Sequence, residues 1–196
     1  MREQLIEAAT DRFHEHGFNG SGIKDITDAA GTPKGSFYNH FDSKESIAVE
    51  VMRRHTRGRQ ISLLSDTTTN AVERIRQHFG YMAHALEQFG YARGCLLGNF
   101  GSELSAQSPV IRAEVAGKFA CWESALASAL DEANADGALA GDVDTVMLAR
   151  FLVSAWEGAV LRAKVIRKAM PLDDFFFALD SLFIDPPETE AGSGKA

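Results

Sequence analysis

The chain has 196 residues, enough for one ordinary domain or two small ones. Hydrophobic residues make up 45% and charged residues 24% of the chain, a composition that is typical of globular proteins and excludes collagen-like, mucin-like and wholly disordered chains. The formal net charge of −7 argues, taken alone, against a nucleic-acid-binding protein, because binding to phosphates needs clustered Lys and Arg.

Neither targeting segments nor metal sites are evident. No apolar run approaches the roughly 20 residues that a membrane span needs, and Met1 is followed by Arg2-Glu3-Gln4 rather than by a signal segment. The two cysteines, Cys95 and Cys121, are too few for a disulfide scaffold and are not spaced as zinc ligands. We therefore expect a soluble, cytoplasmic protein without a membrane partner.

Apolar residues recur at helical spacing along nearly the whole chain and show no sustained strand alternation, which predicts an all-α fold. The first helix is expected over about 2–16, and Gly17-Phe18 is typical of a helix end. A second, short helix is expected over about 23–30. The buried stripe of the first helix is formed by Leu5, Ile6, Ala9 and Phe13.

A third helix is expected over about 33–40, after the turn Gly31-Thr32-Pro33, in which Thr32 can cap the helix and Pro33 fits its first position. Phe37 and Phe41 are four residues apart and should point into the core. A fourth helix is expected over about 43–65, with Ser43 as its cap. The other faces of the third helix then carry Lys34, Ser36, Tyr38, Asn39 and His40.

The polar run 66–70 is the clearest break in the apolar pattern, and we place the domain junction in it or just before it. The stretch 95–100 is apolar but too rich in glycine for a long regular helix, and the tail 185–196 is typical of disorder. Further helices are expected over about 70–90, 109–134, 142–168 and 171–184.

The charge is unevenly distributed. Residues 1–60 carry nine Lys and Arg against nine Asp and Glu, whereas residues 61–196 carry eleven against eighteen. The stretch 31–60 is locally +3. On charge alone a solvated helix face is the more ordinary interpretation, so the local motif has to decide.

Residues 23–40 form a candidate helix-turn-helix, whose second helix would enter the major groove. Gly35 would let the backbone approach DNA closely, and glycine inside a helix otherwise costs about 1 kcal/mol. The segment Gly31-Thr-Pro-Lys-Gly-Ser-Phe-Tyr-Asn-His-Phe-Asp-Ser-Lys-Glu45, preceded by Phe13…Gly17-Phe18 and Ile23-Lys-Asp-Ile26, resembles the DNA-binding domain of the TetR family of transcriptional repressors over about residues 2–55.

This resemblance implies an all-helical homodimer that binds a pseudo-palindromic double-stranded DNA operator and a small-molecule effector. It implies a helix-turn-helix domain over 1–46, a connecting helix over about 43–65, and a ligand-binding and dimerisation domain over 47–184. The DNA-contacting residues would be Lys24, Thr32, Lys34, Gly35, Ser36, Tyr38, Asn39, His40 and Lys44.

The chain departs from the commonest family pattern at two places. Gly22 stands where a hydroxyl residue often caps the second helix, and Thr32-Pro33 stands where an apolar residue and serine are frequent. We expect these changes to shift the operator sequence rather than to abolish DNA binding.

Arg93-Gly94-Cys95-Leu96, with Gly98-Asn99 and Ala163-Lys164, is similar to the branch of the family that senses reactive electrophiles, in which the cysteine of Gly-Cys-Leu is the sensor. A thiol becomes reactive where a cation or a helix N-terminus lowers its pKa, and Lys164 could supply the cation. The alternative, that Cys95 is a small buried apolar residue, stays open. Cys121, beside Trp122, is expected in the core.

The second half also contains enough aromatic and methionine side chains to line an apolar ligand cavity. We expect Trp122 and Trp156 as its walls and Asn99 and Glu103 as its polar groups. The helices over 142–168 and 171–184 carry a surplus of apolar residues that needs a partner surface, which favours a homodimer.

An enzyme is disfavoured, since the chain has no nucleophile elbow, phosphate-binding loop or dinucleotide-binding fingerprint, and no cofactor is implied. His14 and His16 are two residues apart on a helix and cannot hold one metal ion together. The sequence thus predicts an effector-released repressor. A reversible hydrophobic ligand is the alternative effector, and a helical interaction module that does not bind DNA is the more distant rival.

Overall fold

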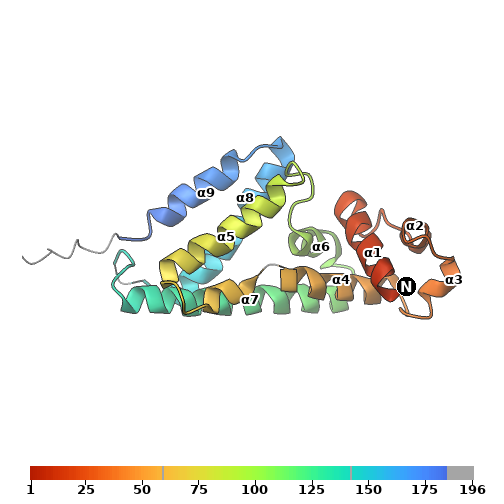
Figure 1. The fold of residues 1–196 in the computed structure, drawn as a ribbon, viewed down its shortest axis with the longest axis horizontal. Helices are drawn as coiled ribbons and strands as arrows, with labels where there is room; N and C mark the ends of the chain where they lie inside the picture. Colours follow the sequence, from red (N-terminus) through yellow and green to blue (C-terminus); the bar gives the residue numbers. More distant parts are fainter. Residues whose placement is uncertain (59, 142, 185–196) are drawn as a thin grey trace, which may run out of the picture.

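The computed structural model describes residues 1–58, 60–141 and 143–184, and within them the fold is all-helical (Figure 1). No helix in these ranges is long and apolar enough to cross a membrane. The predicted disorder of the tail concerns residues outside the described part. The helices are α1 (Arg2–His16), α2 (Ile23–Ala29), α3 (Lys34–Phe37), α4 (Lys44–Gly58), the 3-10 turn η1 (Ile61–Ser65), α5 (Ala71–Glu87), α6 (Leu96–Leu104), α7 (Pro109–Ala135), α8 (Thr145–Ile166) and α9 (Met170–Asp180).

The first three helices form a small lobe at one end of the molecule (Figure 1). α1 packs against α2 and α4, and α2 packs against α3. As predicted, Phe37 and Phe41 are buried, with their ring centroids 5.7 Å apart. Phe13 stacks on Phe18 at 5.6 Å, so the residue that follows the end of α1 belongs to the same core.

The predicted ends of the third and fourth helices are wrong. α3 ends at Phe37, and its N-cap position is occupied by Pro33, so Thr32 does not cap it. α4 ends at Gly58, and Gln60 has a left-handed backbone (φ 50°) before η1, where a helix continuing to residue 65 was expected. The predicted cap at Ser43 is confirmed, because its hydroxyl oxygen accepts the Ser46 N–H at 3.1 Å.

α6 was not expected as a helix, because glycines at 98 and 101 lower helix propensity. Both glycines lie where another helix comes close. A Cβ on Gly98 would lie 2.5 Å from Glu157 Oε2, and one on Gly101 would contact Val115. Packing against α4 and α7, with α8 close at Gly98, thus overrides the weak local propensity.

The large lobe is built around α7, which packs against α4, α5, α6 and α8, while α9 covers α8. Asn70, Ser108 and Asp144 cap α5, α7 and α8 with side-chain oxygens. Arg74 is buried at the base of α5, where its guanidinium donates to Leu64 O at 2.9 Å and pairs with Glu132 of α7.

Candidate functional site

The residues of the predicted DNA-binding face lie on α3 and on the turn that follows it. Lys34, Gly35, Asn39 and His40 are exposed, Ser36 is half-buried, and the Tyr38 side chain is 54% exposed. The inward residue Phe37 supports Tyr38 through an edge contact, with ring centroids 5.4 Å apart. A Cβ on Gly35 would meet no other atom within 4 Å, so its backbone is open to a partner.

Lys24 and Thr32 flank this face, and their polar groups have different surroundings. The ammonium group of Lys24 pairs with Asp28 on the exposed side of α2, and this hydrogen bond raises the pKa of Lys24. The hydroxyl oxygen of Thr32 is buried and has no hydrogen-bond partner within the described part of the chain, although its N–H donates to Thr27 O at 2.9 Å. The Lys24 side chain is therefore exposed and paired with Asp28, while the Thr32 hydroxyl faces inward.

Lys44 was expected on DNA, but its ammonium group is engaged within the protein. Nζ donates to Phe18 O at 2.9 Å and lies 4.1 Å from the centroid of the Phe18 ring. Partial burial lowers the pKa of Lys44. This side chain thus connects the start of α4 to the turn between α1 and α2.

Cys95 is the N-cap residue of α6 and is only 7% exposed. Its sulfur accepts the Gly98 N–H at 3.4 Å. Asn99, one turn further on, donates to Arg93 O at 3.1 Å and accepts from Lys164 Nζ at 3.2 Å. The geometry therefore brings the ammonium group of Lys164 to the same helix end as the thiol.

Two cavities meet at Cys95. The first, of about 570 Å³, lies between α1, α6 and α8 and is lined by polar side chains that include Asn99, Glu103 and Lys164. The second, of about 240 Å³, lies between α5 and α8 and is lined mainly by apolar side chains that include Met82, Leu86 and Trp156. Both cavities are lined by His14, Gly94, Cys95 and Val160.

Two predicted cavity residues have other roles. Trp122 lines neither cavity; it is a core residue whose ring lies 5.7 Å from His78 and 6.1 Å from Phe79. The carboxylate of Glu103 lines the first cavity but accepts the backbone N–H groups of Phe18 and Asn19, at 2.9 and 2.6 Å. A ligand would therefore meet a carboxylate that already has partners.

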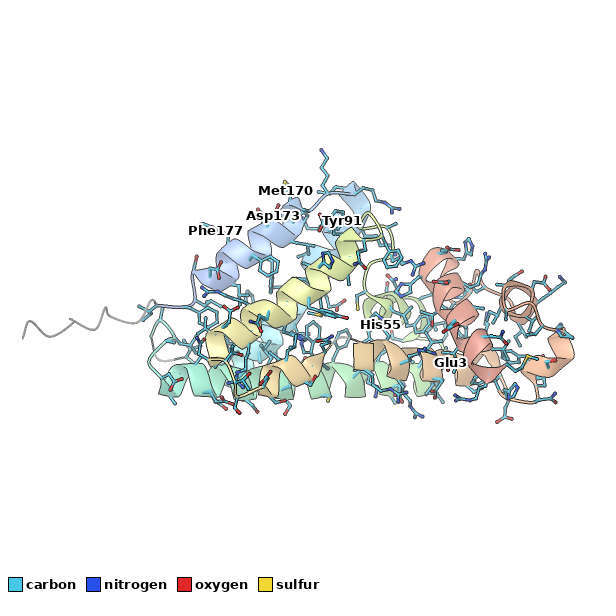
Figure 2. The ribbon with its side chains drawn as sticks, viewed as in Figure 1. Glu3, His55, Tyr91, Met170, Asp173 and Phe177 are labelled. Carbon is cyan, nitrogen blue, oxygen red and sulfur yellow. The ribbon has the colours of Figure 1, made fainter. Side chains whose placement is uncertain are left out.

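Sequence reasoning missed His14, because it comes from the DNA-binding segment and was considered only as a metal ligand. Its ring lies 5.7 Å from that of His55 on α4, which Figure 2 labels at the junction between the two lobes. Burial, followed by the charges of Arg93 and Lys164, lowers the pKa of His14 to about 4. Both α1 and α4 thus reach the second cavity.

The prediction for Cys121 is wrong: this cysteine is exposed on α7. The indole of Trp122 occupies the inward direction at that point of the helix, which leaves the preceding residue on the outer face. The thiol of Cys121 is therefore accessible to a thiol reagent.

A second feature is an exposed apolar surface on α8 and α9. Phe151 is 64% and Phe177 is 79% exposed, and Figure 2 shows Phe177 and Met170 on the outer side of α9. Large apolar side chains in one region of a monomer surface indicate a protein partner. We call this region the α8/α9 face, and its exposed apolar residues are Val146, Met147, Phe151, Leu161, Val165, Ile166, Met170 and Phe177.

Comparison with known proteins decides the family. Residues 5–51 match the family described as bacterial regulatory proteins of the tetR family, and residues 71–179 match the tetracyclin repressor-like C-terminal domain. The chain belongs to the TetR family. It is a DNA-binding transcriptional regulator rather than an enzyme, and its all-helical fold agrees with solved structures of that family.

Relatives cover nearly the whole chain. The HTH-type transcriptional repressor DhaR of Mycobacterium sp. strain GP1 is 37% identical over 100% of this chain and 98% of its own, and NemR of Escherichia coli K12 is 27% identical over 94% of each chain. Among solved structures, the regulatory protein TetR from Rhodobacter sphaeroides has a TM-score of 0.85 at 31% identity, covering 93% of this chain and 98% of that one. The reduced form of E. coli NemR has a TM-score of 0.85 at 27% identity, covering 95% and 98%.

Proposed function

We propose that this TetR-family chain is a dimeric cytoplasmic repressor that leaves its operator when an electrophile modifies Cys95. The observation that carries the proposal is the position of this thiol: it caps α6, forms part of the wall between two cavities, and shares a helix end with the Lys164 ammonium group. A helix N-terminus and a nearby cation both favour the thiolate, which is the reactive form.

The chemistry with a conjugated carbonyl compound is an addition without a leaving group. The thiolate sulfur forms a bond to the β-carbon, the π pair of the carbon–carbon double bond shifts to the bond between the α-carbon and the carbonyl carbon, and the carbonyl π pair moves to the oxygen. The resulting enolate then takes a proton from water at the α-carbon. Lys164 and Asn99 lie at the polar side of the thiol, where the enolate oxygen would develop. The adduct would occupy cavity space next to α1 and α6.

The test of sensing uses a chain in which Cys121 is replaced by serine, because that exposed cysteine would also react. In this background N-ethylmaleimide should release the operator, and the further change Cys95→Ser should abolish the release. Serine is a good N-cap, so α6 should keep its start. Release that persists in the Cys95→Ser protein would return Cys95 to a purely structural role.

The second cavity favours an alternative effector, a reversible hydrophobic ligand. Its apolar lining by Met82, Leu86 and Trp156 suits an uncharged ligand that needs no thiol. Under this alternative an unreactive apolar compound should release both the Cys95→Ser protein and its parent from DNA. Quenching of Trp156 fluorescence would report its binding.

We further propose that α1–α3, within residues 1–46, contact DNA and that the α8/α9 face, within residues 47–184, joins two copies. Two recognition helices would then enter successive major grooves roughly 34–36 Å apart on a pseudo-palindromic operator. Only a ligand with different affinities for two conformations can shift the protein away from this spacing.

The DNA face can be tested at Lys34 and Tyr38. Lys34→Ala with Tyr38→Phe should weaken operator affinity and should reduce the slope of log affinity against log salt by about 1, because one phosphate contact is lost. Lys168→Ala, which removes one exposed cation at the corner between α8 and α9, is the matched control. Unchanged affinity in the double variant would contradict this assignment. Lys44 is left intact, since its ammonium group is bound to Phe18.

A further inference from the structure

The last turn of α6 binds the turn between α1 and α2 through one side chain. Glu103 Oε2 accepts the Phe18 N–H at 2.9 Å, and Oε1 accepts the Asn19 N–H at 2.6 Å. These two N–H groups lie just beyond the end of α1, where no helical carbonyl is available to them. Hydrogen bonds to a carboxylate are stronger than those between neutral groups, and two of them fix direction as well as distance.

Two other residues fit this turn to Glu103. Gly17 has a left-handed backbone (φ 71°), and a Cβ at this position would lie 2.8 Å from Glu103 Oε2. Lys44 Nζ binds the carbonyl of Phe18 on the same turn at 2.9 Å. The α1–α2 turn is therefore held on its N–H side by α6 and on its carbonyl side by α4.

α6 connects this contact to the cavities. The helix begins after Cys95 and ends at Leu104, a rise of about 13 Å over nine residues. Between the two ends, Phe100 packs against Phe13 at 5.4 Å and against Phe18 at 6.2 Å. Figure 1 shows α6 lying beside α1, between the small lobe and the rest of the large lobe. A displacement of Cys95 therefore moves a packed, short helix whose far end holds the DNA-binding segment.

We propose that Glu103 is a positioning residue for DNA binding: it clamps the α1–α2 turn to α6, and occupation of the cavities at Cys95 acts on the recognition helix through this clamp. This inference rests on the proposed function, which places the effector at Cys95. It assigns to Glu103 a task other than ligand binding. The side chain holds α1 and α2, and through them α3, in one orientation relative to the large lobe.

The first experiment measures coupling in the Cys121→Ser background. Glu103→Ala and Glu103→Gln are compared with the parent and with Glu87→Gln, which removes an exposed carboxylate at the end of α5. Mass spectrometry quantifies the N-ethylmaleimide adduct at Cys95, and operator affinity is measured before and after reaction. The parent and Glu87→Gln should lose about tenfold or more in affinity, within the range of ordinary allosteric coupling.

Glu103→Ala should form the same adduct at Cys95, yet its operator affinity should change by less than about threefold on reaction, a small part of the change in the parent. Glu103→Gln keeps the length and one acceptor oxygen, so its response should fall between the two. A full response in Glu103→Ala would overturn the clamp. If Glu103→Ala does not fold or does not bind DNA, the comparison is made with Glu103→Gln, for which a parent-like response would have the same meaning.

A second experiment does not depend on thiol chemistry. Coupling between two sites is reciprocal, so operator binding should change amide hydrogen exchange at residues 94–99 in the parent and leave it unchanged in the Glu103 variants. Without DNA, the amides of Phe18 and Asn19 should exchange about tenfold faster in Glu103→Ala, because they lose their acceptor. Unchanged exchange at these amides would overturn the clamp. If the parent protein forms no adduct at Cys95, or forms the adduct without leaving the operator, the proposed function is contradicted. The hydrogen-exchange measurements then test the role of Glu103 without it.

Discussion

Two glycines in the DNA-binding segment are required for different reasons. Gly17 has φ 71° and lies against Glu103, whereas Gly35 has open space where a Cβ would be. A side chain at Gly17 therefore meets both backbone strain and a collision. At Gly35 a side chain would stand between the α3 backbone and whatever α3 contacts.

We expect Gly17→Ala to lower the free energy of unfolding by about 1–3 kcal/mol, because the backbone of Gly17 (φ 71°, ψ 178°) lies in a region that is essentially restricted to glycine. Urea denaturation measures this change. Gly35→Ala, the control, should leave the free energy of unfolding unchanged or slightly higher, yet weaken operator binding. Equal stability of Gly17→Ala and the parent would contradict the strain argument.

His14 makes stability depend on pH. Its pKa is lowered from 6.5 to about 4, mainly by burial, so the folded protein keeps it neutral where the unfolded chain would protonate it. The unfolded state then binds more protons between these two values, and stability falls as the pH drops from about 6.5 towards 4. The largest loss from this residue is about 3 kcal/mol. His14→Gln should make the urea midpoint less dependent on pH between about pH 7 and pH 4.5. An unchanged pH dependence would refute this role of His14.

Single residues could be predicted from sequence where their role is local. Ser43 caps α4 because its hydroxyl needs only the N–H three residues ahead, and Phe37 and Phe41 are inward by spacing alone. Glu103 and Lys44 could not be placed, because their partners lie 84–85 and 26 residues away. The sequence pattern does not distinguish a charged residue in such a long-range contact from a charged residue that is simply exposed.

At the scale of elements, the long helices and the short α2 were predictable, whereas α6 and the end of α4 were not. α5, α7 and α8 begin within a few residues of their expected starts, because caps and periodicity agree there. α6 escaped prediction because its stability comes from packing against α4 and α7 rather than from propensity. The end of α4 also escaped prediction, because the apolar pattern continues without a gap through η1.

The cap of α7 gives a test at this scale. Ser108 is buried and accepts the Ile111 N–H at 3.2 Å. Ser108→Ala should lower the free energy of unfolding by about 1 kcal/mol, because a buried N–H loses its acceptor. Ser124→Ala, on the exposed side of the same helix, should change stability by less than about 0.5 kcal/mol. Equal effects of the two changes in thermal or chemical denaturation would refute the role of the cap.

At the scale of the whole molecule, the distribution of charge explains more than its sum. The net charge of −7 belongs to residues 61–196, while the stretch 31–60, which includes α3 and α4, is locally positive. The all-α class follows from the apolar pattern, which also predicts a second copy as partner. A cavity was predicted, and Trp156, Asn99 and Glu103 line the two that meet at Cys95. That two cavities meet there, and that α1 and α4 contribute to them, could not be predicted, because no pattern within one helix encodes how α1, α4, α5, α6 and α8 meet.

The α8/α9 face provides the last prediction. Phe151 and Phe177 expose large apolar rings, and burying such side chains is worth about 1.5–3 kcal/mol each. Phe151→Glu with Phe177→Glu should therefore convert the dimer to monomers in sedimentation equilibrium while helix content stays unchanged. Val110→Glu, at the exposed start of α7, is the control and should leave the dimer intact. Because two half-sites are contacted together only by a dimer, the double variant should also bind a full operator no better than one half-site. A double variant that remains dimeric would place the interface elsewhere.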